Sequence, residues 1–168
     1  MAGPTIPLEE YAERRQKAAA LVAEAGYDVL VGNAHESDAS VVRYFTRYWP
    51  LFEMGGVAIA PSGESALMVG MESGEYAKYR SVVDNIHLMP EYRETADPVY
   101  PGIAGSSYAD VFESIGVTDP KRNGVAGWLC TNMAMYEGLR SSFPDAEIVN
   151  ADELTASLRA RKSAAELA

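Results

Sequence analysis

Hydrophobic and polar positions along the chain follow first a helical period and then short continuous runs. Between residues 8 and 25, apolar or small side chains recur every three or four positions. Glu9 and Glu10 occupy the first turn of this segment and Gly26 follows its end, which is typical of an amphipathic helix. Residues 27–31 form a short apolar run that predicts a buried strand. Residues 37–48 return to helical spacing.

The clearest local signal is a hairpin. Residues 56–60 and 65–69 are apolar runs separated by Pro61-Ser62-Gly63-Glu64. Two strands joined by so short a turn are antiparallel neighbours. The remaining pattern predicts helices at 72–83, 108–115, 132–142 and 152–161, strands at 85–89, 124–129 and 147–149, and a long loop at 91–106. We therefore expect an α/β fold, a three-layer α/β/α domain whose mixed sheet has five to six strands and contains one antiparallel hairpin.

Composition narrows the class of protein. The 168 residues suffice for one domain, and 48% of them are hydrophobic, which is enough for one core. The net charge of −10 argues against nucleic acid as a partner, because phosphate binding needs a cationic surface. The single cysteine, Cys130, excludes an internal disulfide and favours a reducing, cytoplasmic location. No apolar run is long enough to span a membrane, and the first eight residues lack the features of a signal peptide, so we expect no membrane partner.

Two possible capping boxes lie near the carboxyl end. Asn150 with Glu153 predicts the start of the helix at 152–161, and Ser163 with Glu166 predicts the start of another helix. Only about one turn of the second helix is present, and so short a helix is marginal alone. We interpret residues 162–168 as the beginning of a longer linker helix; the alternative is a frayed terminus with a chance pairing of Ser163 and Glu166.

Three stretches resemble the amino-terminal domain of the creatinase/prolidase family, which includes the Xaa-Pro aminopeptidases and has a pita-bread catalytic domain. The first is residues 11–31, which contain an opening helix, a Gly turn, an Asp and a strand. The second is residues 42–48, with the sequence Val-Arg-Tyr-Phe-Thr-Arg-Tyr, followed by the hairpin. The third is residues 158–167, with the sequence Leu-Arg-Ala-Arg-Lys-Ser-Ala-Ala-Glu-Leu. The last, with its Lys-Ser-x-x-Glu junction, is the most specific. One departure is Arg47, which stands where the family usually has Gly, so the turn there is expected to be relaxed or shifted.

This resemblance implies that residues 1–161 are a creatinase-type amino-terminal domain and that 162–168 lead into a catalytic domain not contained in this chain. The family's catalytic domain holds two divalent metal ions (Mn, Co or Zn) in most members, so no cofactor and no peptidase activity are expected in residues 1–168. The implied partners are the chain's own catalytic domain and a second copy in a homodimer, with the amino-terminal domain forming a wall of the active site. Two alternatives stay open: a stand-alone module that binds peptides or proteins, as in a histone chaperone related to this domain, and an independent α/β domain that binds a small molecule at its strand ends.

The candidate contact residues lie in an aromatic stretch. Pro50 prevents the helix at 37–48 from continuing, so residues 49–54 form a loop crowded with apolar side chains, which either fold onto the core or cover a partner. The family's corresponding loop faces the catalytic cleft, so Tyr48, Trp49, Phe52 and Glu53 are the residues expected to contact substrate or a partner.

Other reactive side chains favour structural interpretations. His35, Glu36 and Asp38 lack the His-x-x-x-His spacing of a metal site and are expected in a solvated loop. His87 is expected to point outward from a strand. Cys130 is expected to be a small core residue.

Overall fold

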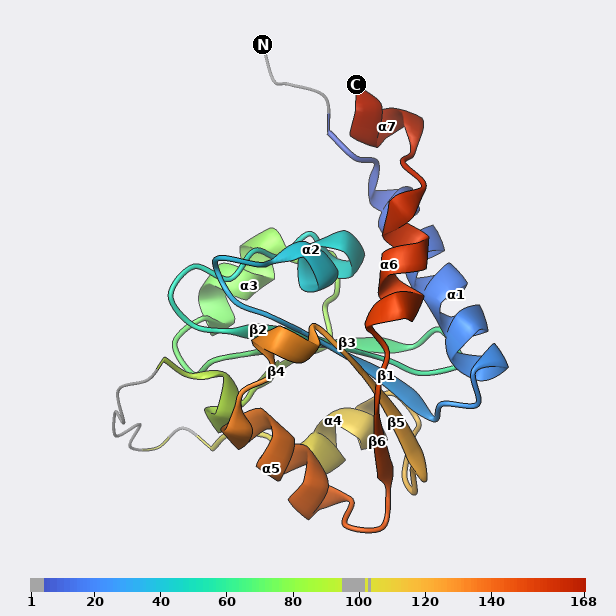
Figure 1. Ribbon diagram of the computed structural model, residues 1–168. Helices are drawn as coiled ribbons and strands as arrows, with labels where there is room; N and C mark the ends of the chain where they lie inside the picture. The colour runs from blue at the N-terminus through green and yellow to red at the C-terminus, as the bar shows by residue number, and fades with distance from the viewer. Residues whose placement is uncertain (1–4, 95–101, 103) are drawn as a thin grey trace.

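One mixed sheet of six strands organises the part of the chain that the computed structural model describes, residues 5–94, 102 and 104–168 (Figure 1). The strands are β1 (Val29–Ala34), β2 (Gly55–Ile59), β3 (Ser65–Val69), β4 (Ile86–Leu88), β5 (Arg122–Ala126) and β6 (Glu147–Asn150). The α-helices are α1 (Leu8–Glu24), α2 (Ser40–Thr46), α3 (Gly74–Arg80), α4 (Tyr108–Ser114), α5 (Met133–Ser142), α6 (Asp152–Ala160) and α7 (Ala164–Leu167). Two 3₁₀ turns are η1 (Pro90–Tyr92) and η2 (Trp128–Cys130).

The strands lie in the order β4-β3-β2-β1-β5-β6. The predicted hairpin is confirmed as the antiparallel pair β2–β3. β2 is also antiparallel to β1, whereas the pairs β1–β5, β5–β6 and β3–β4 are parallel. Five strands therefore end at one edge of the sheet, where β2 begins. We call this the carboxyl edge.

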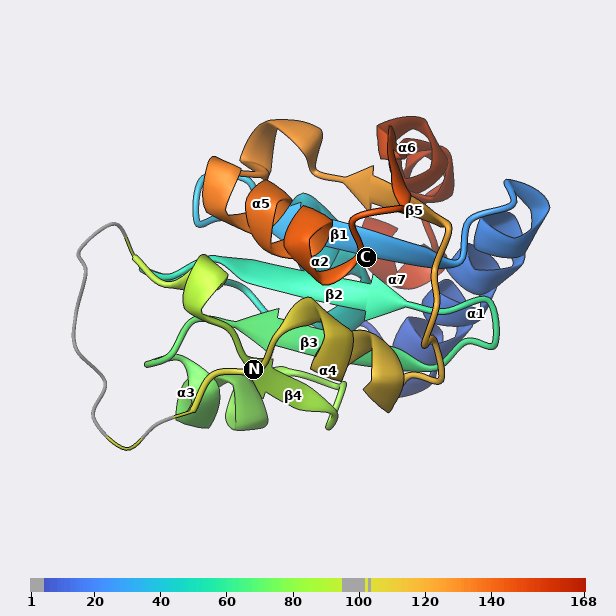
Figure 2. The same cartoon turned by 90° about the horizontal axis from the view of Figure 1, so that it is seen from below.

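Helices cover both faces of the sheet, so the predicted three-layer architecture is confirmed. Figure 1 shows α2, α3 and α6 above the sheet and α4 and α5 below it, and Figure 2 looks at the α4–α5 side. Alternate residues of β1 pack against the helices on the two faces of the sheet. Leu30 packs in the core with α1 and α2, while Val29 and Val31 pack in the core with α4 and α5. This alternation follows from the two-residue period of a strand.

Two predicted strands have bounds that differ from the observed ones by two or more residues at both ends. The strand expected at 27–31 occupies Val29–Ala34, and the one expected at 124–129 is β5, which ends at Ala126. Gly127 ends it by adopting a left-handed conformation, φ 70°. A Cβ at this position would lie 2.1 Å from the backbone oxygen of Asn33. The chain turns here into η2, and this turn shapes the functional site.

The expected capping box of Asn150 with Glu153 was wrong. Ala151 is the residue that precedes α6, and it makes no side-chain capping bond. Asn150 Oδ1 instead accepts a hydrogen bond from the Asp152 backbone N–H at 2.8 Å. The Asp152 carboxylate, in turn, accepts from the Gly127 and Trp128 backbone N–H groups, so this segment is ordered by a contact with η2 rather than by its own cap.

The second expected capping box is confirmed. Ser163 and Glu166 bond reciprocally at the start of α7. The helix expected at 72–83 is shorter and spans Gly74–Arg80; Tyr79 within it is 81% exposed. Of the loop expected at 91–106, residues 95–101 and 103 lie outside the described residues.

Candidate functional site

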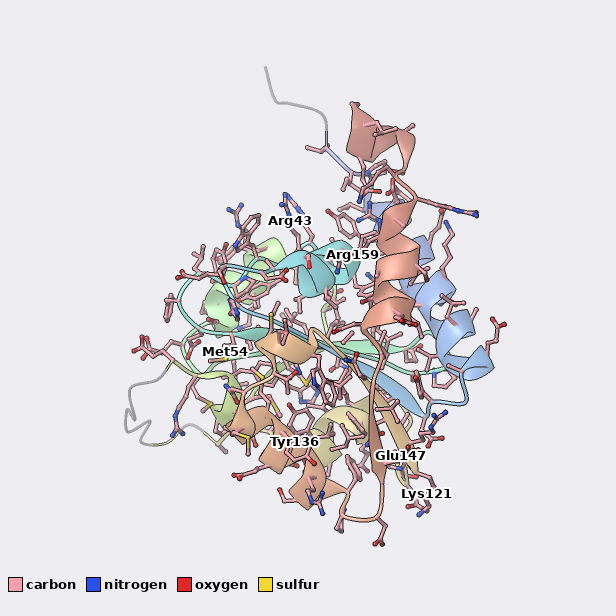
Figure 3. The ribbon with its side chains drawn as sticks, viewed as in Figure 1. Arg43, Met54, Lys121, Tyr136, Glu147 and Arg159 are labelled. Carbon is pink, nitrogen blue, oxygen red and sulfur yellow. The ribbon has the colours of Figure 1, made fainter. Side chains whose placement is uncertain are left out.

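Exposed apolar side chains gather in two groups at the carboxyl edge. The first group belongs to the loop between α2 and β2, and consists of Trp49, Leu51 and Phe52, which are 41%, 49% and 55% exposed. The second belongs to η2 and the start of α5; its members are Trp128, Leu129 and Met133. The two segments touch where Asn132 Nδ2 lies 3.1 Å from Met54 Sδ. Figure 3 shows Met54 at this end of the sheet, far from Lys121 and Glu147 at the opposite end.

The backbone of the first loop is fixed at its beginning. Arg47 follows α2 with φ 65°, the left-handed region, and its N–H donates to the Arg43 carbonyl oxygen. The turn is therefore kept with Arg in place of Gly, and the expected relaxation does not occur. The Arg43 guanidinium lies 4.6 Å from the centroid of the Trp49 ring, a cation–π contact that holds the exposed indole in one orientation.

Glu53 anchors the other end of this loop inside the protein. Its side chain is only 2% exposed, and Oε2 accepts a hydrogen bond from the Glu72 backbone N–H at 3.1 Å. Burial raises the pKa of the Glu53 carboxyl, and hydrogen bonds from Ser73 and from the backbone lower it only in part. Burial also raises the pKa of the neighbouring Tyr48 hydroxyl to about 12, and the Glu53 charge adds to this rise. Tyr48 and Glu53 thus lie beneath the loop, while Trp49 and Phe52 lie on its surface.

The η2 segment is held by polar contacts with α6 and β1. Asp152 Oδ1 accepts from the Gly127 N–H at 2.7 Å and from the Trp128 N–H at 3.2 Å. Asn33, at the end of β1, donates from Nδ2 to Thr131 Oγ1 at 2.9 Å. The Tyr92 hydroxyl donates to Asn33 Oδ1 at 2.7 Å. Asn33 is 2% exposed, so this network is fixed within the core.

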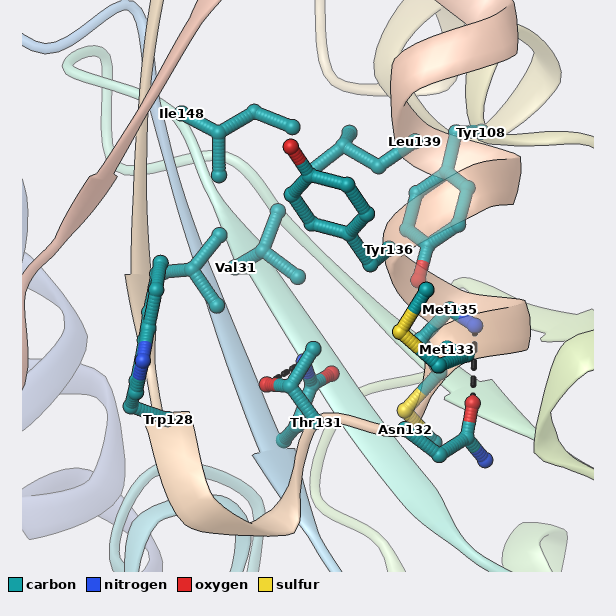
Figure 4. A pocket seen from close by; sticks show the side chains of 12 residues that line it. Val31, Tyr108, Trp128, Thr131, Asn132, Met133, Met135, Tyr136, Leu139 and Ile148 are labelled. Atoms are coloured by element: carbon teal, nitrogen blue, oxygen red, sulfur yellow. Dashed lines mark hydrogen bonds between the residues drawn. The ribbon is translucent and has the colours of Figure 1, made fainter.

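A pocket opens between η2, α5 and the strands β1 and β5, and has a volume of about 230 Å³. Figure 4 shows Trp128 on one side of it and Tyr136 on the other, with Val31 between them. Sequence reasoning missed this pocket because residues 128 and 129 were assigned to a strand. The signal that could have found it is Gly127 directly after the buried pair Val125 and Ala126, since a glycine there permits the left-handed turn.

The other reactive side chains make structural contacts. His87 is half-buried, and its ring nitrogens lie 3.0 Å from Ser106 Oγ and 3.1 Å from Ser114 Oγ. Burial lowers the pKa of His87. Cys130 is buried, and burial raises the pKa of its thiol, which disfavours the reactive thiolate. Glu36 and Asp38 are exposed, with His35 half-buried beside them.

The described residues contain neither a candidate metal-binding group nor a candidate membrane-spanning helix. No group of three or more His, Cys, Asp or Glu side chains could hold a metal ion there. Within the same residues, no helix combines the length and apolar character that a membrane crossing requires. The described site consists of an exposed apolar surface and an adjoining pocket with an uncharged lining.

The six-stranded mixed sheet between two layers of helices defines a three-layer α/β domain. The family model for the creatinase/prolidase N-terminal domain matches residues 14–161, and the chain therefore belongs to that family. No curated protein sequence matches the chain significantly.

Solved structures support the same fold. A proline dipeptidase structure from Streptococcus pneumoniae is 18% identical with a TM-score of 0.64, covering 88% of this chain and 98% of that one. The prolidase from Pyrococcus horikoshii is 17% identical with a TM-score of 0.64, and the match covers 92% of this chain but 37% of the prolidase. A dipeptidase from Mycobacterium ulcerans is 19% identical with a TM-score of 0.65, and the match covers 96% of this chain and 40% of that one. The chain thus spans about two fifths of these two longer proteins.

Proposed function

We propose that the chain is the non-catalytic amino-terminal domain of a longer subunit, a metal-dependent Xaa-Pro peptidase or a creatinase-like amidohydrolase of the cytoplasm. In this proposal the catalytic domain holds two divalent metal ions (Mn, Co or Zn), which activate water for hydrolysis. This domain forms a wall of the active site and contributes to a homodimer. Membership of the family supports the proposal, as does the similarity to prolidase and dipeptidase structures.

The observation that carries the proposal is the exposed aromatic pair of the loop at the carboxyl edge. Trp49 and Phe52 are 41% and 55% exposed, although aromatic side chains of this size usually gain stability by burial. Contiguous exposed apolar side chains mark surfaces that bind a partner. The loop is already ordered by Arg43 and Glu53, so docking would cost little conformational entropy.

The four residues of the loop take different roles in this proposal. Trp49 and Phe52 contact the catalytic domain or its substrate, because their rings face outward. Tyr48 and Glu53 position these rings from below, because both side chains are buried. A partner at this edge would also cover Leu129, which is 95% exposed.

Hydrolysis of Xaa-Pro dipeptides by the complete subunit tests the proposal. With manganese or cobalt present, the Trp49→Ser/Phe52→Ser double variant should lose about 30-fold or more in kcat/KM, since one hot-spot aromatic at an interface is worth about 2 kcal/mol. The control is Tyr79→Ser, which removes an even more exposed ring from α3 and should leave kcat/KM unchanged. Equal losses in both variants would refute the role of the loop. Turnover by the pure 168-residue chain would refute its non-catalytic role.

The alternative function is a stand-alone module that binds peptides or proteins. The net charge of −10 favours this alternative for basic partners. The reading frame of the gene distinguishes the two functions. A downstream domain with two Asp, one His and two Glu in the metal-binding pattern of the family supports the enzyme, and a downstream domain without them, or none, supports the module.

A further inference from the structure

The pocket between η2 and α5 lies where the connections of two parallel strands diverge. β1 continues into α2, which packs on one face of the sheet, and β5 continues into α5, which packs on the other face. Open α/β sheets bind ligands at such points, because the diverging connections leave a crevice above the strand ends. The position of the pocket therefore favours a ligand site rather than a packing defect.

The lining of the pocket is uncharged. Aliphatic, aromatic and methionine side chains form most of it, with the amides of Asn33 and Asn132 and the hydroxyls of Thr131, Tyr108 and Tyr136, and it contains no Asp, Glu, Lys, Arg or His. A carboxylate or ammonium group would lose its hydration here without gaining an opposite charge. The volume of about 230 Å³ exceeds that of an engineered apolar cavity of roughly 150 Å³ that binds benzene. A ring with one substituent therefore fits.

One end of the pocket can form hydrogen bonds. Asn33 Nδ2 donates one hydrogen to Thr131 Oγ1, and Thr131 Oγ1 donates to the Gly127 carbonyl oxygen at 3.0 Å. An amide nitrogen carries two hydrogens and a hydroxyl oxygen has two acceptor positions, so each group has capacity beyond these bonds. Figure 4 shows the Thr131 side chain, with its dashed hydrogen bond, below the apolar space between Trp128 and Tyr136.

We propose that this pocket binds a small neutral molecule that consists of a ring bearing one hydroxyl or comparable hydrogen-bonding group. The ring lies between Trp128 and Tyr136 over Val31, and the hydroxyl bonds with Asn33 and Thr131. The proposal does not depend on the proposed contact of Trp49 and Phe52 with a catalytic domain.

Phenol and benzoate form a matched pair of probes, because they share a ring and differ in charge. In an amide NMR titration of the 168-residue chain, phenol should give saturable shifts at Val31, Thr131 and Leu139, with a Kd of about 10 mM or tighter. Benzoate should give none at these amides. Failure of phenol to saturate, equal binding of benzoate, or shifts confined to residues 49–54 would each overturn the proposal.

Two variants locate the binding. Ile148→Trp fills the pocket from β6 and should abolish the phenol shifts, while the amides of α1 stay at their wild-type positions. Thr131→Val keeps the volume but removes the hydroxyl, and should weaken phenol binding about fivefold, the effect of one neutral hydrogen bond. Toluene binding should be unchanged by Thr131→Val. Unchanged phenol binding in both variants would refute the assignment.

Discussion

Arg14 Nη2 lies 3.3 Å from Glu166 Oε2 and so joins α1 to α7 across almost the whole length of the chain. The Arg14 side chain is 4% exposed. It also bonds to Glu10 at 3.1 Å through Nε and to the Tyr44 carbonyl oxygen at 3.1 Å through Nη1. Its guanidinium lies 4.2 Å from the centroid of the Tyr44 ring. These contacts hold α7 and α2 against α1.

Replacing Arg14 by Ala should destabilise the domain by about 2 kcal/mol, because the buried charge is hydrogen-bonded and its removal leaves Glu10 and Glu166 without their cation. Lys17→Ala is the matched control on the same helix. Its ion pair with Glu13 is exposed on both sides and should contribute less than about 0.5 kcal/mol. Urea unfolding at pH 7 measures the loss of stability in each of the two variants. Similar losses would mean that the Arg14 network adds nothing beyond a surface pair.

Arg47→Gly should stabilise the domain by about 0.5–1 kcal/mol. An L-residue in the left-handed region costs roughly 1–2 kcal/mol, and the greater freedom of Gly in the unfolded chain offsets part of the gain. Arg47→Val should instead destabilise it, because a branched Cβ is less tolerant of positive φ. In thermal unfolding, Arg47→Gly should have the highest Tm, the wild type an intermediate one and Arg47→Val the lowest. A less stable Gly variant would contradict the strain at this position.

The sequence predicted the layers and the hairpin because both depend on local periodicity, which residues 56–69 display clearly. The sequence could not predict that β2 pairs antiparallel with β1, because that pairing depends on the position of α2, which connects the two strands. It also extended the strand β5 through Trp128, because an apolar run does not reveal the left-handed turn at Gly127. The pocket was missed for the same reason. In the loop at 49–54, Pro50 predicted the break in the helix. Burial of the ionisable Glu53 beside exposed Phe52 requires a tertiary contact with Glu72 that no local pattern encodes.

The buried Glu53 carboxyl should make stability fall as the pH rises. Its pKa in the folded protein is raised by burial above the ordinary 4.5, so the folded state holds the proton more tightly than the unfolded state does. Stability from this group is therefore complete below about pH 4 and is lost as the pH rises through the folded pKa. Glu53→Gln removes the titration, so its stability relative to the wild type should increase from pH 4 to pH 7. Urea midpoints at the two pH values measure this change, and Glu64→Gln on the exposed hairpin turn is the control. A relative stability that stays constant or decreases would show that burial does not raise this pKa.

Gly127→Ala should be far more costly than the same change at Gly116. Both glycines have positive φ, 70° and 80°, so an Ala strains the backbone by roughly 1–2 kcal/mol at either position. A Cβ at Gly116 meets open space, whereas one at Gly127 lies 2.1 Å from the Asn33 backbone oxygen. Since a backbone atom cannot rotate away, β1 and the η2 turn must separate, which adds overpacking strain of about 1–3 kcal/mol. We expect a total loss of about 3 kcal/mol or more for Gly127→Ala and about 1 kcal/mol for Gly116→Ala, measured by urea unfolding. Amide shifts at Thr131 should accompany the first change alone, because the turn that carries Trp128 and Thr131 moves with Gly127; equal losses for the two variants would mean that this close approach does not restrain the turn.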